Sequence, residues 1–394
     1  MKLLHTSDWH IGRSFHRADL LAAQAAFLDH LVETVRAERV DAVVVAGDVY
    51  DRALPPTDAV DLVDDGLARL VGTGAAVLVL SGNHDSATRL GFGSRVLAAG
   101  GLHLRTRPTA AGQPVLLADA HGPVALYGIP YLEPEIVHRE LLGAPAQPDG
   151  AEPGRRRVPS HAAVLQACTA LVRADLARRP GARSVVAAHA FVVGGVESAS
   201  ERDISVGGVA HVPAGLFDGF SYTALGHLHG AQAVAPAVRY SGSPLPYSFS
   251  EAAHTKGSWL VELDATGVAE VTAVPAPVHR PLAQLRGPLA ELLADPRHAA
   301  AEQAFVAAVL TDAQRPLDGM RRLQDRFPFA VTLEFDPQGA PGSASLTYAE
   351  RVRGRDDVEI AEAFVAHVRG GAPTAGEVEL LRDAFTAVRQ AEAA

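Results

Sequence analysis

The chain has 394 residues, of which 48% are hydrophobic, and a formal net charge of −10; this composition excludes a largely disordered protein and argues against one that coats nucleic acid through general positive charge. No apolar run approaches the roughly 20 residues that a membrane helix needs, and the early acidic residue Asp8 argues against a signal peptide. Cys168 is the only cysteine, so no intrachain disulfide can form, and we expect a cytoplasmic protein.

Short apolar runs alternate with helical patterns over the first two-thirds of the chain. The runs are continuous, as in strands that are buried on both faces. They predict strands at residues 2–6, 42–46, 76–80, 124–128, 184–188 and 222–225. Helices are predicted at residues 18–38, 57–71 and 160–179, with Thr57 as the N-cap of the second. Strands that alternate with helices indicate a layered α/β domain.

A short span with three prolines follows the last predicted strands and marks a domain boundary. We expect a first domain over residues 1–276 and a smaller α/β domain over residues 277–346. Within the smaller domain, the sequence pattern predicts helices near residues 299–312 and 316–325 and a strand at 330–335.

Residues 347–394 contain two predicted amphipathic helices, which are split by the glycine- and proline-containing run 370–374. The second helix has an apolar stripe on one face, which comprises Val378, Leu381, Phe385 and Val388. This stripe can pack on its own domain or bind a partner, and the pattern favours neither.

Residue types that bind metals follow most of the predicted strands. They are Asp8, His10, Asp48, Asn83, His84, His189, His227 and His229. Ligands bind at the carboxyl ends of strands in α/β sheets, so we expect these side chains to meet at one edge. Asp8 and His10 are two positions apart, and so are His227 and His229. Side chains two positions apart point to the same side of an extended backbone.

The donor types indicate a hydrolytic metal centre. Carboxylates, one amide oxygen and several imidazoles suit Mn, Fe or Zn, and no thiolate is available for a structural zinc site. Without His84 the set offers seven ligands, too many for one ion, and it fits two ions if a carboxylate bridges them. Asp48 is the natural bridge. Any one of these residues alone is more often structural, so the prediction rests on their joint occurrence at strand ends.

The order of the motifs resembles that of the calcineurin-type metallophosphoesterases: Asp-x-His, Gly-Asp, Gly-Asn-His-Asp, a lone His and Gly-His-x-His. Segments 4–12, 47–51, 201–208 and 240–251 are similar to those of bacterial SbcD nuclease subunits, within a resemblance that covers residues 1–265. The resemblance implies a layered phosphoesterase β-sandwich flanked by helices, with a small α/β capping domain and a C-terminal helical hairpin.

The resemblance also implies roles for individual residues. One metal ion would be bound by Asp8, His10, Asp48 and His229. The other would be bound by Asp48, Asn83, His189 and His227. His84 would act on the phosphate as an acid or as a charge stabiliser. Archaeal relatives have a histidine where this chain has Asp51, so Asp51 is given no catalytic role.

One further acidic residue of the Gly-Asn-His-Asp motif has two interpretations. Asp85 either orients a metal-binding imidazole through its other ring nitrogen or caps a helix predicted over residues 86–97. The sequence leaves both open. Arg13, Arg89 and Arg202 stand near the ligand loops and are candidates for contact with DNA.

The activity that the resemblance implies is cleavage of DNA ends and hairpins. It would depend on two divalent ions, with Mn²⁺ favoured over Mg²⁺, Fe²⁺ or Zn²⁺. The partner would be an SbcC-type ATPase that docks on residues 347–394, and the chain would form a homodimer within a heterotetramer.

Two other functions would use the same fold. A phosphatase of small molecules or proteins would have the same metal site, but the SbcD-like segments and the long C-terminal part argue against it. A non-catalytic scaffold would be expected to have lost ligands, and none is missing here.

Overall fold

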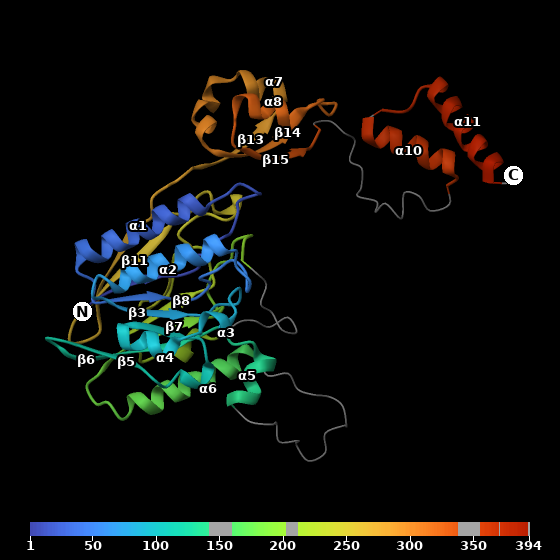
Figure 1. Ribbon diagram of the computed structural model, residues 1–394. Coiled ribbons are helices and arrows are strands. Elements are labelled where there is room, and N and C mark those ends of the chain that lie inside the picture. Colours follow the sequence, from blue (N-terminus) through green and yellow to red (C-terminus); the bar gives the residue numbers. More distant parts are fainter. Residues whose placement is uncertain (142–159, 202–211, 338–354, 370, 393–394) are drawn as a thin grey trace, which may run out of the picture. The chain divides into compact units, whose positions relative to one another are not determined.

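The computed structural model describes residues 1–141, 160–201, 212–337, 355–369 and 371–392 (Figure 1). The chain divides into two compact units, Met1–His279 and Arg280–Ala394. In the described ranges, no helix has the length and apolar character required to cross a membrane.

Unit 1 contains two six-stranded sheets, the first in the order β12-β11-β1-β2-β3-β4. Its parallel strands are β1 (Lys2–Thr6), β2 (Ala42–Val45), β3 (Ala76–Leu80) and β4 (Leu102–Arg105). Strand β11 (Gly257–Leu263) pairs antiparallel with β1, and β12 (Val268–Pro275) pairs antiparallel with β11. The chain therefore returns late in unit 1 to complete the sheet that it began.

The second sheet has the order β5-β6-β7-β8-β10-β9. Its parallel strands are β6 (Gly122–Ile129), β7 (Arg183–His189), β8 (Tyr222–Gly226) and β10 (Val238–Tyr240). Its antiparallel edges are β5 (Val115–Asp119) and β9 (Gln232–Ala235). All six strands predicted for this region are present in the two sheets, with small shifts at their ends. The remaining strands carry weaker apolar patterns, and sequence reasoning did not delimit all of them.

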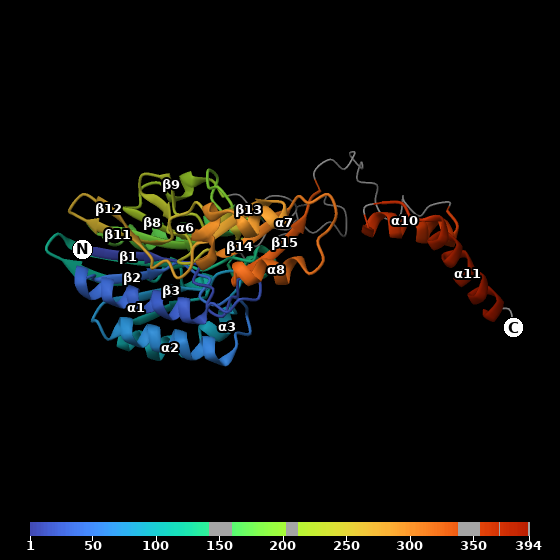
Figure 2. The same cartoon turned by 90° about the horizontal axis from the view of Figure 1, so that it is seen from above.

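Three hydrophobic layers hold unit 1 together. Between the sheets, Val44 and Leu80 of the first sheet pack in one cluster with Val185 and Ala224 of the second. Helices α1 (Leu21–Glu38) and α2 (Thr57–Val71) cover the outer face of the first sheet (Figures 1 and 2). Helices α5 (Pro134–Leu141) and α6 (His161–Leu176) pack on the second. This arrangement confirms the predicted sandwich flanked by helices.

Two local predictions in unit 1 are wrong. The N-cap of α2 is Pro56 and makes no side-chain cap bond, whereas Thr57 is the first helical residue. Pro56 has no side-chain acceptor, and the carboxylate of Asp58 in the first turn instead accepts from the backbone N–H of Ala59 at 2.8 Å. Residues 86–97 form two short helices, α3 (Ala87–Leu90) and α4 (Ser94–Leu97), because Gly93 adopts a φ of 71° that ends the helical path.

Unit 2 contains a parallel sheet of β13 (Leu282–Gly287), β14 (Phe305–Leu310) and β15 (Ala330–Phe335). Helices α7 (Leu289–Ala294) and α8 (Gly319–Arg326) contribute to its hydrophobic cluster. The helix predicted near residues 299–312 is wrong, because a 3₁₀ helix over Pro296–Gln303 precedes strand β14. Alanine-rich sequence favours helix, but here pairing on both sides of β14 outweighs that preference.

The C-terminal part of unit 2 contains the two predicted helices, α10 (Asp357–Arg369) and α11 (Ala375–Glu392). They contact one another, and Arg369 forms a two-bond ion pair with Glu377 at their junction. Of the predicted stripe, Val378 is half-buried, so the hairpin covers part of its apolar surface itself.

Candidate metal centre

The predicted site residues come together at one edge of the two sheets, beyond the carboxyl ends of parallel strands. The first sheet supplies the residues that follow β1, β2 and β3, namely Asp8, His10, Asp48, Asn83 and His84. The second sheet supplies those at or after the ends of β7 and β8, namely His189, His227 and His229. Because both sheets end at this edge, residues more than 200 positions apart are within hydrogen-bond distance of one another.

Asp48 lies between donors from the two sheets. Its Oδ2 atom is 3.7 Å from Nε2 of His10 and 3.5 Å from Nε2 of His189. Its Oδ1 atom accepts a hydrogen bond of 2.9 Å from the backbone N–H of His84. One carboxylate oxygen therefore faces a histidine from each sheet, which is the placement expected of a carboxylate that bridges two metal ions.

Asp8, His10 and His229 form a first cluster whose ligand atoms lie within 4.8 Å of one another. The Nε2 atoms of His10 and His229 are 3.1 Å apart, and two imidazole nitrogens in this position can share only one proton. The Nδ1 atom of His10 is buried and has no protein partner. A cation bound beside the two Nε2 atoms would accept the lone pairs of both, whereas a shared proton is bonded to one nitrogen and only hydrogen-bonded to the other.

Asn83, His189 and His227 form a second cluster. The Oδ1 atom of Asn83 is 2.9 Å from Nε2 of His189 and 3.3 Å from Nδ1 of His227. His189 uses Nδ1 to contact the carbonyl oxygen of Ala46 at 2.9 Å. A carbonyl only accepts, so the ring proton lies on Nδ1 and the Nε2 lone pair faces Asn83. Two acceptors that face each other in this way fit a bound divalent cation.

The ligand loops have strained backbone conformations. Asp8, His10 and Asp48 have φ angles of 53°, 45° and 50°, in a left-handed region that non-glycine residues seldom adopt. The expectation that Asp8 and His10 lie on an extended backbone is therefore wrong, because β1 ends at Thr6. Turns aim these side chains, and backbone bonds of 3.0 Å to the segment after β2 hold the turns in place.

Close approach of the sheets explains a glycine beside the ligands. A Cβ atom at Gly226 would lie 2.0 Å from the carbonyl oxygen of Ala46 and 3.0 Å from Nδ1 of His189. The residue before His227 must therefore lack a side chain for the two sheets to meet at this distance.

Burial controls the protonation of the site. Burial, followed by the charge of Asp8, raises the pKa of Asp48 well above its usual range. Burial raises the pKa of Asp8 to about 6. It lowers the pKa of His189 to about 3 and lowers the pKa of His10 well below its usual range. Neutral imidazoles are the form that binds metals, and a bound cation would favour ionised carboxylates.

His84 lies at the mouth of the site. Its Nδ1 atom is 2.7 Å from the carbonyl oxygen of Asp51, and its ring meets that of His10 edge-on, with centroids 4.6 Å apart. A cavity of about 640 Å³ opens here, and His84, Asn83, Arg13 and Asp51 are among its lining residues. The main chain, rather than the side chain, of Asp51 therefore fixes one face of His84.

Asp85 has a role that neither sequence interpretation described. Its carboxylate accepts backbone N–H bonds from Gly82 at 2.9 Å, Val49 at 3.0 Å and Tyr50 at 2.9 Å. It thus joins the loop after β3 to the loop after β2, which carries Asp48. The N-cap of α3 is the next residue, Ser86.

Two supporting residues were missed by sequence reasoning. The Oγ atom of Ser7 donates to Oδ2 of Asp8 at 2.6 Å. Gln24 of α1 donates to the carbonyl oxygen of His10 at 2.9 Å and accepts from Gly12 at 3.0 Å. Gln24 is 1% exposed, and a buried amide on the apolar face of a helix was the available signal.

The arginines predicted to contact DNA differ in their surroundings. The guanidinium of Arg13 lies 4.8 Å from the ring centroid of Tyr247 and donates to the carbonyl oxygen of Ser200 at 2.9 Å. Arg13 therefore connects the segment that carries Tyr247 with the segment that carries Ser200. Arg89 is exposed on α3. Arg202 lies outside the described residues, as does most of the SbcD-like segment 201–208.

Comparisons with known proteins identify both parts of the chain. Residues 1–146 match the calcineurin-like phosphoesterase family, and residues 278–369 match the family described as the type 5 capsule protein repressor C-terminal domain. A solved dimetal phosphatase from Danio rerio is 16% identical to this chain. The match covers 70% of this chain and 99% of that chain, at a TM-score of 0.39.

The curated relatives include the SbcD component of the SbcCD nuclease from Escherichia coli K12. It is 34% identical over 304 residues, which are 75% of this chain and 73% of that protein. The same protein from Escherichia coli O157:H7 matches with the same identity and coverage. The chain therefore belongs to the SbcD family of nuclease subunits, and its first 146 residues carry the family's calcineurin-like phosphoesterase region.

Proposed function

We propose that this chain is the metal-dependent nuclease subunit of a DNA-processing enzyme and that it hydrolyses phosphodiesters at a centre for two divalent ions. The observation that carries the proposal is the position of Asp48, whose Oδ2 atom faces the Nε2 atoms of His10 and His189 from opposite clusters. The oxygen and nitrogen donors fit Mn²⁺, which we favour over Mg²⁺, Fe²⁺ or Zn²⁺.

The chain's residues divide the work at this centre. Asp8, His10 and His229 would hold one ion, Asn83, His189 and His227 the other, and Asp48 both. When bound, such ions polarise a phosphodiester and lower the pKa of a water that attacks it. His84, held at the mouth by the carbonyl oxygen of Asp51, would donate a proton or stabilise charge at the phosphate.

Family membership favours DNA over other phosphoesters. The curated relatives are named as nuclease subunits, and the local charge allows a nucleic acid to bind. Two divalent ions with Asp8 and Asp48 leave a site charge of about +2, although the whole chain carries −10. We propose exonuclease action on double-stranded ends and endonuclease action on hairpins and single strands.

Substitution of His84 by alanine tests this function. We expect the purified chain, with Mn²⁺ and its ATPase partner, to cleave linear and hairpin DNA in preference to para-nitrophenyl phosphate. His84→Ala should lower DNA cleavage by roughly 10²–10⁴-fold, because an acid at the phosphate is lost, while calorimetry finds the same metal affinity. His121→Ala, at an exposed turn, is the matched control. Preferential cleavage of para-nitrophenyl phosphate would contradict a nuclease, and loss of metal binding in His84→Ala would contradict its assigned role.

Alanine substitutions of Asp48 and Asp8 test which carboxylate binds both ions and which binds one. Asp48→Ala should weaken the binding of both ions, because its carboxylate faces both clusters, whereas Asp8→Ala should weaken one. Isothermal titration with Mn²⁺, together with metal analysis of the purified protein, measures the two sites. If one site alone empties in Asp48→Ala, this carboxylate does not bridge.

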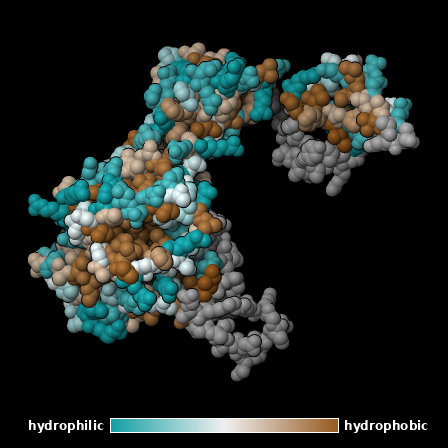
Figure 3. Space-filling model, viewed as in Figure 1, coloured by the Kyte–Doolittle hydropathy of each residue, from teal (hydrophilic) through white to brown (hydrophobic). Residues whose placement is uncertain are grey.

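We further propose that two copies of the chain associate through an apolar patch on α2, α4 and the loop residues beside them. The patch comprises Leu54, Val60, Phe92, Val96 and Leu97, which are between 40% and 85% exposed. They line a groove of about 840 Å³ (Figure 3). Apolar side chains at this exposure are typical of interfaces, and a homodimer is the association that the family resemblance implies.

Charge inserted into this patch tests the dimer. Phe92 is 85% exposed, so Phe92→Glu should leave the monomer folded and abolish association by desolvating a carboxylate in the interface. Light scattering should give twice the chain mass of 41.2 kDa for the wild type and the chain mass for the variant. Leu116→Glu, on the exposed edge strand β5, is the control and should remain dimeric. A monomeric wild type, or a dimeric Phe92→Glu, would contradict the patch as the interface.

We also propose that residues 277–346 form a capping domain and that residues 347–394 bind an SbcC-type ATPase. Among the described residues of α10 and α11, Phe364, Val368, Leu380 and Val388 are 54–69% exposed. Hydrophobic side chains gather on the visible face of these two helices (Figure 3). An amphipathic hairpin with such a face suits a helical segment of the partner.

Disruption of this face tests the partner site. Phe364→Glu combined with Leu380→Glu should abolish co-purification with the ATPase, because both side chains would enter the interface as charges. Mn²⁺ binding should not change, since the metal centre lies in unit 1. Thr386→Glu adds a charge on α11 outside the apolar set and serves as the control. If a chain that lacks residues 347–394 still binds the ATPase normally, this assignment is wrong.

A further inference from the structure

His229 is held by three side chains outside the metal centre. Its backbone N–H donates to Oε1 of Glu201 at 2.7 Å, and its carbonyl oxygen accepts from Nζ of Lys256 at 2.8 Å. Its Nδ1 atom lies 2.5 Å from Oγ of Ser200. Only Nε2 points to the metal centre, where it faces His10. Every polar atom of His229 outside the centre therefore has a partner.

The direction of the hydrogen bonds fixes the ring proton of His229. Oγ of Ser200 also bonds to the carboxylate of Glu251, which is 1% exposed and paired with Lys256. An ionised carboxylate only accepts, so the single hydroxyl proton of Ser200 points to Glu251. The hydroxyl oxygen must then accept from Nδ1–H of His229. The proton is thereby held on Nδ1, and the Nε2 lone pair is free to bind a metal.

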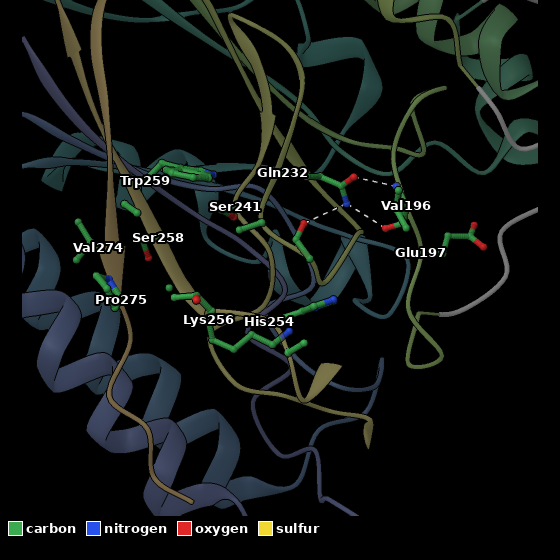
Figure 4. A pocket seen from close by; sticks show the side chains of 16 residues that line it. Val196, Glu197, Gln232, Ser241, His254, Lys256, Ser258, Trp259, Val274 and Pro275 are labelled. Carbon is green, nitrogen blue, oxygen red and sulfur yellow. Dashed lines mark hydrogen bonds between the residues drawn. The ribbon is translucent and has the colours of Figure 1, made fainter. Parts of the chain in front are cut away.

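The segment that carries Ser200 is itself anchored. The side-chain amide of Gln232 accepts from the backbone N–H of Val196 at 2.8 Å and donates to its carbonyl oxygen at 3.0 Å (Figure 4). Lys256 lines the same pocket and immediately precedes β11. The hydrogen-bonded series Glu251–Ser200–His229, called the relay below, is therefore anchored to both sheets, through Gln232 of β9 and through Lys256 next to β11.

We propose that Glu251 is a positioning residue that acts through Ser200 to set the tautomer and orientation of His229. It would thereby raise the affinity of the centre for the ion that His229 binds. The inference rests on the proposed metal centre. His189 achieves the same tautomer through the carbonyl oxygen of Ala46, so a relay of side chains replaces a backbone acceptor at His229. Partners of this kind typically change metal affinity by about 10–100-fold.

Substitution of Ser200 by alanine breaks the relay and leaves the buried pair of Glu251 and Lys256 intact. We expect the full-length Ser200→Ala variant to bind one Mn²⁺ ion about 10-fold more weakly in calorimetry, with the other ion unaffected. Ser200→Thr keeps a hydroxyl and should restore the affinity.

Ser250→Ala is the matched control, because Oγ of Ser250 accepts from the backbone N–H of Ala199 at 3.0 Å in the same segment. It should leave both Mn²⁺ affinities unchanged. Unchanged affinities in Ser200→Ala, or an equal loss in Ser250→Ala, would overturn the positioning role in favour of loop packing. A wild type that binds fewer than two ions would instead overturn the proposed two-metal centre, so the two failures are distinguishable.

Discussion

The candidate metal centre depends on burying nitrogen and oxygen lone pairs that face one another. Nε2 of His189 and Oδ1 of Asn83 are 2.9 Å apart, and the Nε2 atoms of His10 and His229 are 3.1 Å apart. Buried acceptors without a donor cost about 1–3 kcal/mol each, and Asp48 adds a buried carboxylate beside them. A proton on Nε2 of His10 could join only the second of these pairs, whereas divalent cations would accept the lone pairs of both.

The surrounding fold opposes collapse of this site. Left-handed backbone at Asp8, His10 and Asp48 costs of order 1–3 kcal/mol per residue, and such conformations persist only where neighbours determine them. Asp85 supplies three backbone contacts on one side of the loops, and Gln24 supplies two on another. Asp85 and Gln24 therefore hold main chain, whereas Ser7 and Ser200 contact the side chains of Asp8 and His229.

Sequence reasoning predicted that the candidate side chains meet, because each follows a continuous apolar strand and the edge of a parallel sheet collects strand ends. It failed where tertiary contacts decide the outcome. The alanine-rich run before Leu310 became a strand through pairing on both sides. Glu251 stands in the SbcD-like segment 240–251, but sequence reasoning gave it no role, because that role depends on a serine 51 positions earlier and on the fold that joins them. Backbone turns at Asp8 and His10 were likewise invisible to a pattern based on periodicity.

The metal centre and the identity of the substrate have different physical origins. Two ions held by neutral imidazoles and a shared carboxylate would polarise any phosphoester that reached them, so the site chemistry does not by itself select DNA. Selection requires surfaces that decide what approaches. In the described part of the chain, exposed apolar side chains gather on α2–α4 and on α10–α11. If a second copy and an ATPase bind at these surfaces, as proposed, the assembly and not the metal centre would supply the selection of DNA.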